Sequence, residues 1–459
     1  MIGTHRIGAP AFDELAAGQG DFAAVSALAR AQESRRLLQV YAVVATARER
    51  LPGARTAHLT EALDLLAHLQ RTAPDAARTV LTHPYTGAWA MRGLLRLRAP
   101  EFDPAAPDLD QLLGHLGSIA AAAALRADPE HGTPGRVELY TVGGWAHLPT
   151  LGRVRVAADP GRIALTGRQW SVGGRLISRR QFNRRCSASA AGLSATLSIE
   201  DLDPYRDVHR WQPTERLTAH QVSLLQRNFA FAWDQLAHSH RAYAAALPAA
   251  LSTLVPVAAG PGVSLSSSSR HAFGGLALTP EVGPTTLAVT LVHEFQHNKL
   301  GAIQDITKLS ARSAARYRAP WRLDPRPVGA LLQGAYAHLG IADFWRARRH
   351  VVEGEEQDRA QAEFAVHRAH VGEAIRTLRG SGELTPDGER IVAGMAATAE
   401  PWWAEDVPAD AARRAAERVR SGRRTWAERN GLAAGHEPAD RVVDPNDTSG
   451  ASGRTHNAR

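Results

Sequence analysis

The segment LVHEFQHNKLG, residues 291–301, constrains the fold more than any other part of the chain. His293 and His297 are four residues apart, so on a helix both imidazoles project from one face and bind the same ion. The preceding apolar run TLAVTLV favours a helix that packs in a core. Burying these polar residues beside an apolar stripe without a partner would be costly, which favours a metal site over a solvated helix face.

The residues before the motif predict a strand or hairpin that leads into this helix. In VSLSSSSRHAFGGLALT, residues 263–279, a serine-rich run is followed by a Gly-Gly pair and a short apolar run. In the next segment Thr285 or Thr286 lies near the expected helix cap, and Gly301 lies just past the expected end. A strand followed by a helix with HExxH is the context that the motif requires, so we expect a zincin-like strand-plus-helix core.

Glu294 lies one position round the helix from His293, within reach of the ion or of its bound water. With zinc, two histidines and a third ligand leave an open position where Glu294 deprotonates a water for peptide hydrolysis. With ferrous iron, three ligands on one face leave positions for a 2-oxo acid and dioxygen. Imidazole suits both metals, so the ligand type alone leaves both chemistries open.

The third ligand does not follow the HExxHxxGxxH arrangement, because Leu300 and Ile303 occupy the positions of its glycine and its last histidine. A ligand from the following segment is the alternative, and the candidates are His338, Asp324, Asp343 and Glu353. We favour His338 in GAYAHLG, a polar residue inside an apolar helix. The competing interpretation is a hydrogen-bonded core histidine.

The linker PWRLDPRP places Arg322 and Arg326 in a Pro-bounded loop between the two expected metal helices. The planar guanidinium of arginine suits a carboxylate, so these residues are candidates to bind the distal carboxylate of a co-substrate or a peptide carboxylate. The alternative is a surface loop with solvated arginines.

The hydrophobic periodicity changes along the chain and predicts an α+β, mainly α-helical fold. Apolar residues recur at three- and four-residue intervals, give way to short Gly-punctuated runs, and then return to helical spacing, with Thr218 and Gln221 as a capping box. The expected segments are a helical domain at 1–128, a β-rich module at 129–212, the HExxH metal-binding core at 213–355, a helical segment at 356–435 and a disordered tail at 436–459.

The composition indicates a chain that folds in a reducing compartment. Cys186 is the only cysteine, which excludes an internal disulfide framework. No apolar run is long enough for a membrane span, and the first residues lack the pattern of a signal peptide. We therefore expect a cytoplasmic protein with neither membrane nor nucleic acid as a partner, although its net charge is +8. The sequence does not determine the oligomeric state.

The run from Arg179 to Arg185 concentrates four arginines around one aromatic residue. Such a cluster attracts an acidic leader peptide, although a charge run is more often a solvated face. Cys186 follows the cluster, whose charge favours a lower thiol pKa, but no histidine is placed to form a nucleophile pair, so we interpret it as a bystander.

Several blocks of the chain, taken in order, resemble the HEXXH-motif peptide-modification family found near ribosomal peptide clusters of actinobacteria. The blocks are AFDELAAGQGD, SIEDLDPYRD, SSSSRHAFGGLALT, LVHEFQHNKLGAIQDI and APWRLDPRPVGALLQGAYAHLGIADFW. The resemblance implies an iron and 2-oxoglutarate-dependent enzyme that hydroxylates the β-carbon of a residue in a precursor peptide. It implies His293 and His297 as ligands, whereas His338, Arg322 and Arg326 are our own assignments.

The sequence analysis therefore favours an Fe(II)/2-oxoglutarate-dependent peptide hydroxylase whose partner is a ribosomally made precursor peptide. One alternative is a zinc metallopeptidase that removes a leader peptide with Glu294 as general base. A second alternative is a non-catalytic scaffold that binds the peptide.

Overall fold

The structure is a computed structural model, in which a mainly helical α+β chain forms two compact units. The described residues are 5–127, 136–156, 161–166, 169–172, 175–176, 184–260, 262–431 and 442–443. The continuous unit is Val25–Glu294, and the discontinuous unit joins Met1–Ala24 to Phe295–Arg459. This grouping differs from the five segments expected from composition, and each unit is described by itself.

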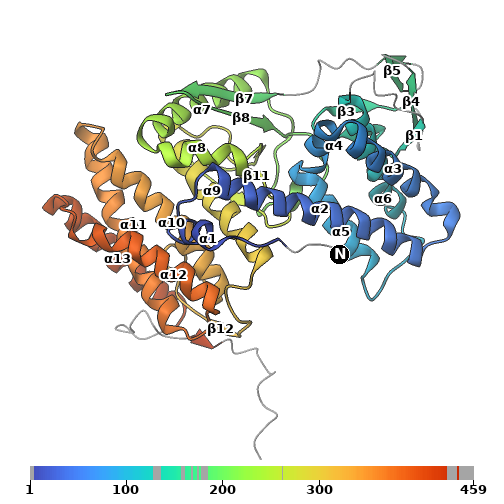
Figure 1. Cartoon of the computed structure of the whole chain (residues 1–459). Helices are drawn as coiled ribbons and strands as arrows, with labels where there is room; N and C mark the ends of the chain where they lie inside the picture. Colours follow the sequence, from blue (N-terminus) through green and yellow to red (C-terminus); the bar gives the residue numbers. More distant parts are fainter. Residues whose placement is uncertain are drawn as a thin grey trace, which may run out of the picture. The chain divides into compact units, whose positions relative to one another are not determined.

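The continuous unit begins with the helices expected from the periodicity of the first 128 residues. They are α2 (Phe22–Arg50), α3 (Gly53–Thr72), α4 (Pro74–Leu81), α5 (Pro84–Leu97) and α6 (Leu109–Arg126), drawn in blue to teal in Figure 1. Prolines start α4 and α5, where the missing N–H costs nothing. The alanine run of α6 is buried, and Gly117 allows β1 (Arg136–Leu139) to approach, since a Cβ there would lie 2.0 Å from the Glu138 carbonyl oxygen.

A five-stranded mixed sheet lies later in the same unit, in the order β10-β11-β9-β8-β7. Its strands are β7 (Arg185–Ala190), β8 (Leu193–Ile199), β9 (Thr253–Pro256), β10 (Ser266–Ser268) and β11 (Gly275–Leu278). The three central strands are parallel, whereas β7 and β10 pair antiparallel and form the two edges. All residues of β9 and β11 are buried, as expected for strands covered on both faces.

The expected β-rich segment divides between this sheet and other strands. β1 pairs in a second sheet with β4 (Gly161–Thr166), followed by β5 (Gln169–Val172) and β6 (Arg175–Leu176). β2 (Trp145–Leu148) and β3 (Gly152–Arg155) form a hairpin. β8 instead pairs with β9 in the sheet that precedes the HExxH helix, and β7 pairs with β8 at its edge. The sequence did not predict this pairing, because β8 and β9 lie far apart in the chain.

The helices around the HExxH motif follow the sequence prediction with one correction. α7 (Ala219–Ser239) starts at the expected capping box, where Thr218 and Gln221 satisfy each other's backbone N–H. A short helix, α8 (Arg241–Ala250), follows it. The hairpin of β10 and β11 leads into α9 (Pro284–Ile306). The predicted end at Gly301 is wrong: the helix continues for five more residues, because a helical glycine costs only about 1 kcal/mol, which packing offsets.

The discontinuous unit is a group of packed helices. They are α1 (Ala9–Ala16), α10 (Val328–Arg348), α11 (Gly354–Gly380), α12 (Pro386–Ala399) and α13 (Ala409–Arg429). α10 packs on α11, α11 on α12 and α13, and α1 on α12; α10 to α13 are drawn in orange to red in Figure 1. Two-residue strands, β12 (Ala315–Arg316) and β13 (Val442–Val443), pair antiparallel.

None of the described helices is long and apolar enough to cross a membrane. The predicted disordered tail at 436–459 lies outside the described residues except for the two residues of β13.

Candidate metal centre

Glu294 is more deeply buried than either histidine of the HExxH motif, with only 1% of its surface exposed. The hydroxyl of Ser268, on the edge strand β10, donates a 2.5 Å hydrogen bond to its Oε2 atom. Nε2 of His293 lies 4.0 Å from Oε1 of Glu294, and the His293 side chain is 22% exposed. The carboxylate is therefore fixed in the core, while the adjacent imidazole reaches the surface.

His209 adds a buried imidazole near Glu294. Burial lowers the pKa of His209 to about 4, although the charge of Glu294 acts in the opposite direction. Nε2 of His209 is hydrogen-bonded to the Tyr85 hydroxyl at 2.9 Å. A neutral histidine thus lies beside the glutamate of the motif, and sequence reasoning missed it because Tyr85 and His209 are 124 residues apart.

His297 is oriented by a glutamine of α10. Its Nδ1 donates to Oε1 of Gln333 at 3.0 Å, because an amide oxygen only accepts. The amide of Gln333 is itself fixed, since its Nε2 donates to Oε1 of Gln304 at 2.8 Å. A proton on Nδ1 leaves the lone pair of the imidazole on Nε2, which is the form in which histidine binds a metal ion.

The end of α9 is anchored to the start of the chain by Lys299. Its ammonium group is fully buried and donates to the carbonyl oxygens of Gly18 at 2.9 Å and Gln19 at 2.6 Å. Nε2 of Gln296 donates to the same Gly18 oxygen at 3.0 Å. Burial holds the pKa of Lys299 well below its ordinary value. These contacts fix the helix turn that carries His297.

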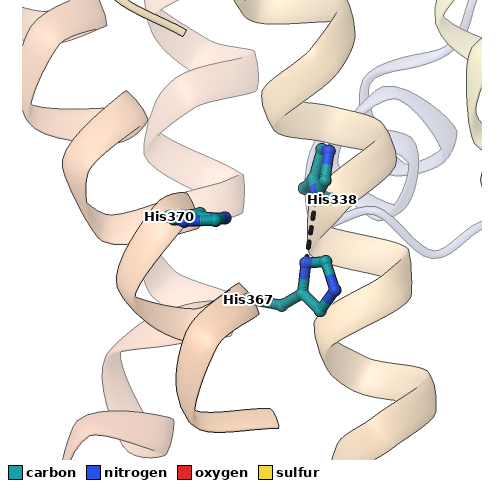
Figure 2. A group of neighbouring side chains, drawn as sticks. All are labelled: His338, His367 and His370. Carbon is teal, nitrogen blue, oxygen red and sulfur yellow. Dashed lines mark hydrogen bonds between the residues drawn. The ribbon is translucent and has the colours of Figure 1, made fainter. Parts of the chain in front are cut away.

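His338 lies inside the apolar helix α10, as predicted, and its ring faces α11. Figure 2 shows His338 from one helix opposite His367 and His370 from the other, with a hydrogen bond between His338 and His367. The two Nδ1 atoms are 3.0 Å apart, and one ligand atom from each of the three rings lies within 4.8 Å of the others. This three-histidine group is a candidate metal site in its own right.

The three-histidine group has the surroundings of a metal site. Oε2 of Glu363 lies 3.5 Å from Nε2 of His367, and Arg418 donates to Oε1 of the same carboxylate at 2.9 Å. A carboxylate behind a histidine fixes its ring and raises its basicity as a ligand. Burial lowers the pKa of His370 to about 3, so this ring is neutral and able to bind a cation at neutral pH.

Trp321 holds the other face of His338. The two rings stack with centroids 4.2 Å apart, and Gly334 makes room for the indole, since a Cβ there would lie 2.3 Å from Trp321. His338 is therefore positioned by α11 and by the PWRLDPRP loop. Its assignment as third ligand of the HExxH ion stays a prediction. His367 and His370 were missed in the sequence, although three-residue spacing on one helix face was visible in AVHRAHVGEA.

Arg322 and Arg326 converge on a carboxylate of the chain itself. Nε of Arg322 donates to Oδ1 of Asp324 at 2.8 Å, and Nη1 of Arg326 donates to Oδ2 at 3.0 Å. Burial would raise the pKa of Asp324, but these two bonds hold it below its ordinary value. The side chains remain about a third exposed. The two guanidinium groups thus bind a carboxylate of the chain itself, and their assignment to a co-substrate or peptide carboxylate stays a prediction.

The predicted leader-binding arginines fall largely outside the described residues, since residues 179–183 are not among them. The guanidinium group of Arg184 binds within the fold. Its Nη1 donates a hydrogen bond to the carbonyl oxygen of Leu217 and lies 3.4 Å from Oδ2 of Asp201. Cys186 is fully buried, and burial raises the pKa of its thiol to about 12. The expected lowering by the arginine cluster is wrong, because desolvation dominates. The interpretation of Cys186 as a bystander stays a prediction.

The chain matches no protein-family model and no curated protein. The site must therefore be interpreted from its own residues.

Proposed function

We propose that this chain is a metal-dependent enzyme that modifies a ribosomally made precursor peptide, by Fe(II)/2-oxoglutarate-dependent β-hydroxylation of a residue in the peptide. The metal ligands in this proposal are His293, His297 and His338. Iron with 2-oxoglutarate supplies the oxidising chemistry when bound. Cytoplasmic location belongs to the same proposal.

The observation that carries the metal site is the hydrogen bond between His297 and Gln333. Metal-binding histidines almost always donate their second ring N–H to a fixed acceptor. Nδ1 of His297 has such an acceptor, held in turn by Gln304. A solvent-exposed histidine on a helix face does not need an acceptor that is itself fixed by a second glutamine. The hydrogen bonds from His297 to Gln333 and from Gln333 to Gln304 therefore favour a ligand role for His297.

The position of Glu294 supports a reaction at the same helix. Its carboxylate is buried and receives the Ser268 hydroxyl, so it is fixed and ready to accept a proton or to orient a water. In the hydroxylase, Glu294 orients groups around the ion and excludes bulk water. In a peptidase, the same carboxylate is the general base.

The edge strand β10 supports an extended peptide as substrate. β10 is the last strand of its sheet and pairs on one side with β11. The backbone groups of a sheet edge bind an extended chain by strand addition. Since Ser268 of this strand contacts Glu294, a peptide added there would pass beside the motif. The order of β11, α9 and an antiparallel edge strand also favours a zincin-like core.

The loop arginines support a carboxylate-bearing co-substrate. Arg322 and Arg326 form a two-pronged site, and Asp324 takes the place that the distal carboxylate of 2-oxoglutarate would take. In the proposal, the co-substrate displaces Asp324 from at least one arginine.

The deciding experiment is aerobic reaction of iron-loaded full-length protein with 2-oxoglutarate and the peptide encoded next to the gene, analysed by mass spectrometry. A gain of one oxygen atom that depends on 2-oxoglutarate is expected. His293→Ala with His297→Ala should abolish it, and His240→Gln, a buried histidine of α8's N-terminus, should leave it unchanged. Peptide cleavage without oxygen incorporation would contradict the proposal.

A zinc metallopeptidase is the second candidate, and the burial of Glu294 beside a peptide-accepting edge favours it. This activity survives the removal of oxygen and 2-oxoglutarate, and Glu294→Gln should abolish it. Tight peptide binding with neither product, in protein that contains no metal, would identify a non-catalytic scaffold instead.

A further inference from the structure

Four buried ionisable side chains meet in the continuous unit, outside the HExxH motif. His83 precedes α5, His147 lies on β2, and Glu200 and Asp203 follow β8. Their exposed fractions lie between 0% for Asp203 and 8% for Glu200. Four such groups are rarely buried together unless they are paired or hold a cation.

The two imidazoles and the two carboxylates face one another. Nε2 of His83 lies 3.5 Å from Oε2 of Glu200, and its Nδ1 lies 3.8 Å from Oδ2 of Asp203. Nε2 of His147 lies 3.7 Å from Oε1 of Glu200, and its Nδ1 lies 3.5 Å from Oδ2 of Asp203. These separations exceed the ordinary hydrogen-bond length of about 3.2 Å. They are close to the ~3.4 Å between tetrahedral ligands bound at about 2.0–2.1 Å to zinc.

Several polar atoms of this group are buried without a hydrogen-bond partner among the described residues. They are Nδ1 of His83, both ring nitrogens of His147 and Oδ2 of Asp203. An unsatisfied buried polar group costs about 1–3 kcal/mol, and more when it is charged. One cation bound by Oδ2 of Asp203 and by one nitrogen of each imidazole would remove much of this cost at once.

One oxygen of each carboxylate is fixed by the backbone. Oε1 of Glu200 accepts the N–H groups of Leu202 at 3.0 Å and Asp203 at 2.8 Å. Oδ1 of Asp203 accepts the N–H of Tyr205 at 2.8 Å. With these bonds in place, Oδ2 of Asp203 faces both imidazoles and Oε2 of Glu200 faces His83, which is the ordered outer shell that a metal site requires.

The charges of the group suit a divalent cation. Two carboxylates with two neutral imidazoles carry a charge of −2, which a divalent ion cancels. A third histidine, His115, stacks on His147.

We propose that His83, Glu200 and Asp203, with His147 as fourth ligand, form a closed structural zinc site. One atom from each of the first three residues already lies within 4.8 Å of the others. Two imidazoles favour a transition metal over calcium or magnesium, and four protein ligands leave no open position for chemistry. The ion ties together the start of α5, the β2 hairpin and the loop after β8.

The test measures zinc bound by the full chain after chelator treatment and equilibrium dialysis against micromolar zinc. The starting protein carries His293→Ala, His297→Ala and His367→Ala, so that the other two histidine groups do not contribute. We expect one equivalent of zinc, and Asp203→Asn in this background should remove it. Excess chelator should lower the melting temperature of the starting protein by at least about 3 °C, and zinc should restore it.

The control is His240→Gln in the same background, because His240 is a buried histidine of the same unit outside the group; it should keep its zinc. If the Asp203 variant does not fold, X-ray absorption of the zinc-loaded starting protein decides. A shell of two imidazoles with oxygen ligands supports the site. A folded starting protein that binds no zinc would overturn the proposed site, and so would an unchanged zinc content with Asp203→Asn. The four side chains would then share protons among themselves instead of binding a metal ion.

Discussion

Nδ1 of His297 lies 3.0 Å from the side-chain oxygen of Gln333, so one residue of α10 determines which nitrogen of the motif histidine faces away from it. This relationship joins the two segments that carry the predicted ligands, and it makes the metal hypothesis testable without knowing the substrate.

Gln333→Ala should lower the metal affinity of the HExxH helix by about 10–100-fold, because His297 loses the acceptor that fixes its ring. The measurement is competition for Co²⁺ with a coloured chelator. Gln333→Glu should restore most of the affinity, since a carboxylate accepts the same bond. Gln357→Ala, on α11, is the control. Equal affinities in all four proteins would remove His297 from the ligand set.

Replacing Arg322 and Arg326 together by alanine should weaken 2-oxoglutarate binding at least about tenfold, because both guanidinium groups that would donate hydrogen bonds to its carboxylate are lost. Asp324→Ala should act in the opposite direction by freeing the two guanidinium groups. Calorimetric titration of the metal-loaded protein measures both effects. Arg312→Ala removes an exposed arginine of the same segment and should change nothing. A double variant with unaltered affinity would limit the arginines to holding Asp324.

Glu373→Ala should lower the free energy of unfolding by about 3–5 kcal/mol, because Glu373 pairs with Arg318 and Arg423 while almost fully buried. Without the carboxylate, the Arg318 guanidinium is left buried and uncompensated. Urea unfolding followed by circular dichroism gives the value. Glu417→Ala breaks an exposed pair with Arg420 and should have no measurable effect. Similar midpoints for the two variants would contradict the argument.

The Cys186 thiol should resist iodoacetamide at pH 8 in the folded protein and react once urea unfolds it. Burial raises its pKa from 9.0 to about 12, so the folded state favours the neutral thiol. This contribution to stability is complete below about pH 9 and is lost as the pH rises toward 12. Ser187→Cys places a thiol on the exposed side of the same strand and should react in the folded state. Rapid labelling of folded wild-type protein would refute the burial argument.

Deleting residues 1–20 should destabilise the discontinuous unit, because the Lys299 ammonium loses the carbonyl oxygens of Gly18 and Gln19. Lys299→Met should recover part of the lost melting temperature in the truncated chain, since it removes the buried charge. In the full-length chain the same substitution should not stabilise. If Lys299→Met had the same effect in both chains, the N-terminal carbonyls would not be its partners.

Local rules predicted the parts of the fold that depend on neighbouring residues. The Thr218 to Gln221 capping box and the hairpin before the HExxH helix lie within a few residues of the groups they bind, so their patterns were complete in the sequence. The end of α9 was not predictable in this way, because contacts of the last turns, rather than Gly301, determine it.

Side-chain partners from distant segments could not be predicted. The sequence identified His338 as a polar residue in an apolar helix, but His367 and His370 approach it only through the packing of α10 on α11. The sequence analysis named Asp324 as a candidate metal ligand, whereas its carboxylate accepts hydrogen bonds from Arg322 and Arg326. His83 and Asp203 are 120 positions apart, and only the fold brings them together.

The division of the chain into a continuous and a discontinuous unit has a consequence for biosynthesis. Residues 1–24 are synthesised long before residue 295, where most of the unit to which they belong begins. This unit cannot be completed until the continuous unit has emerged from the ribosome. The survival of the nascent segment during that interval, as well as the final stability of the protein, would then limit how much protein a cell obtains.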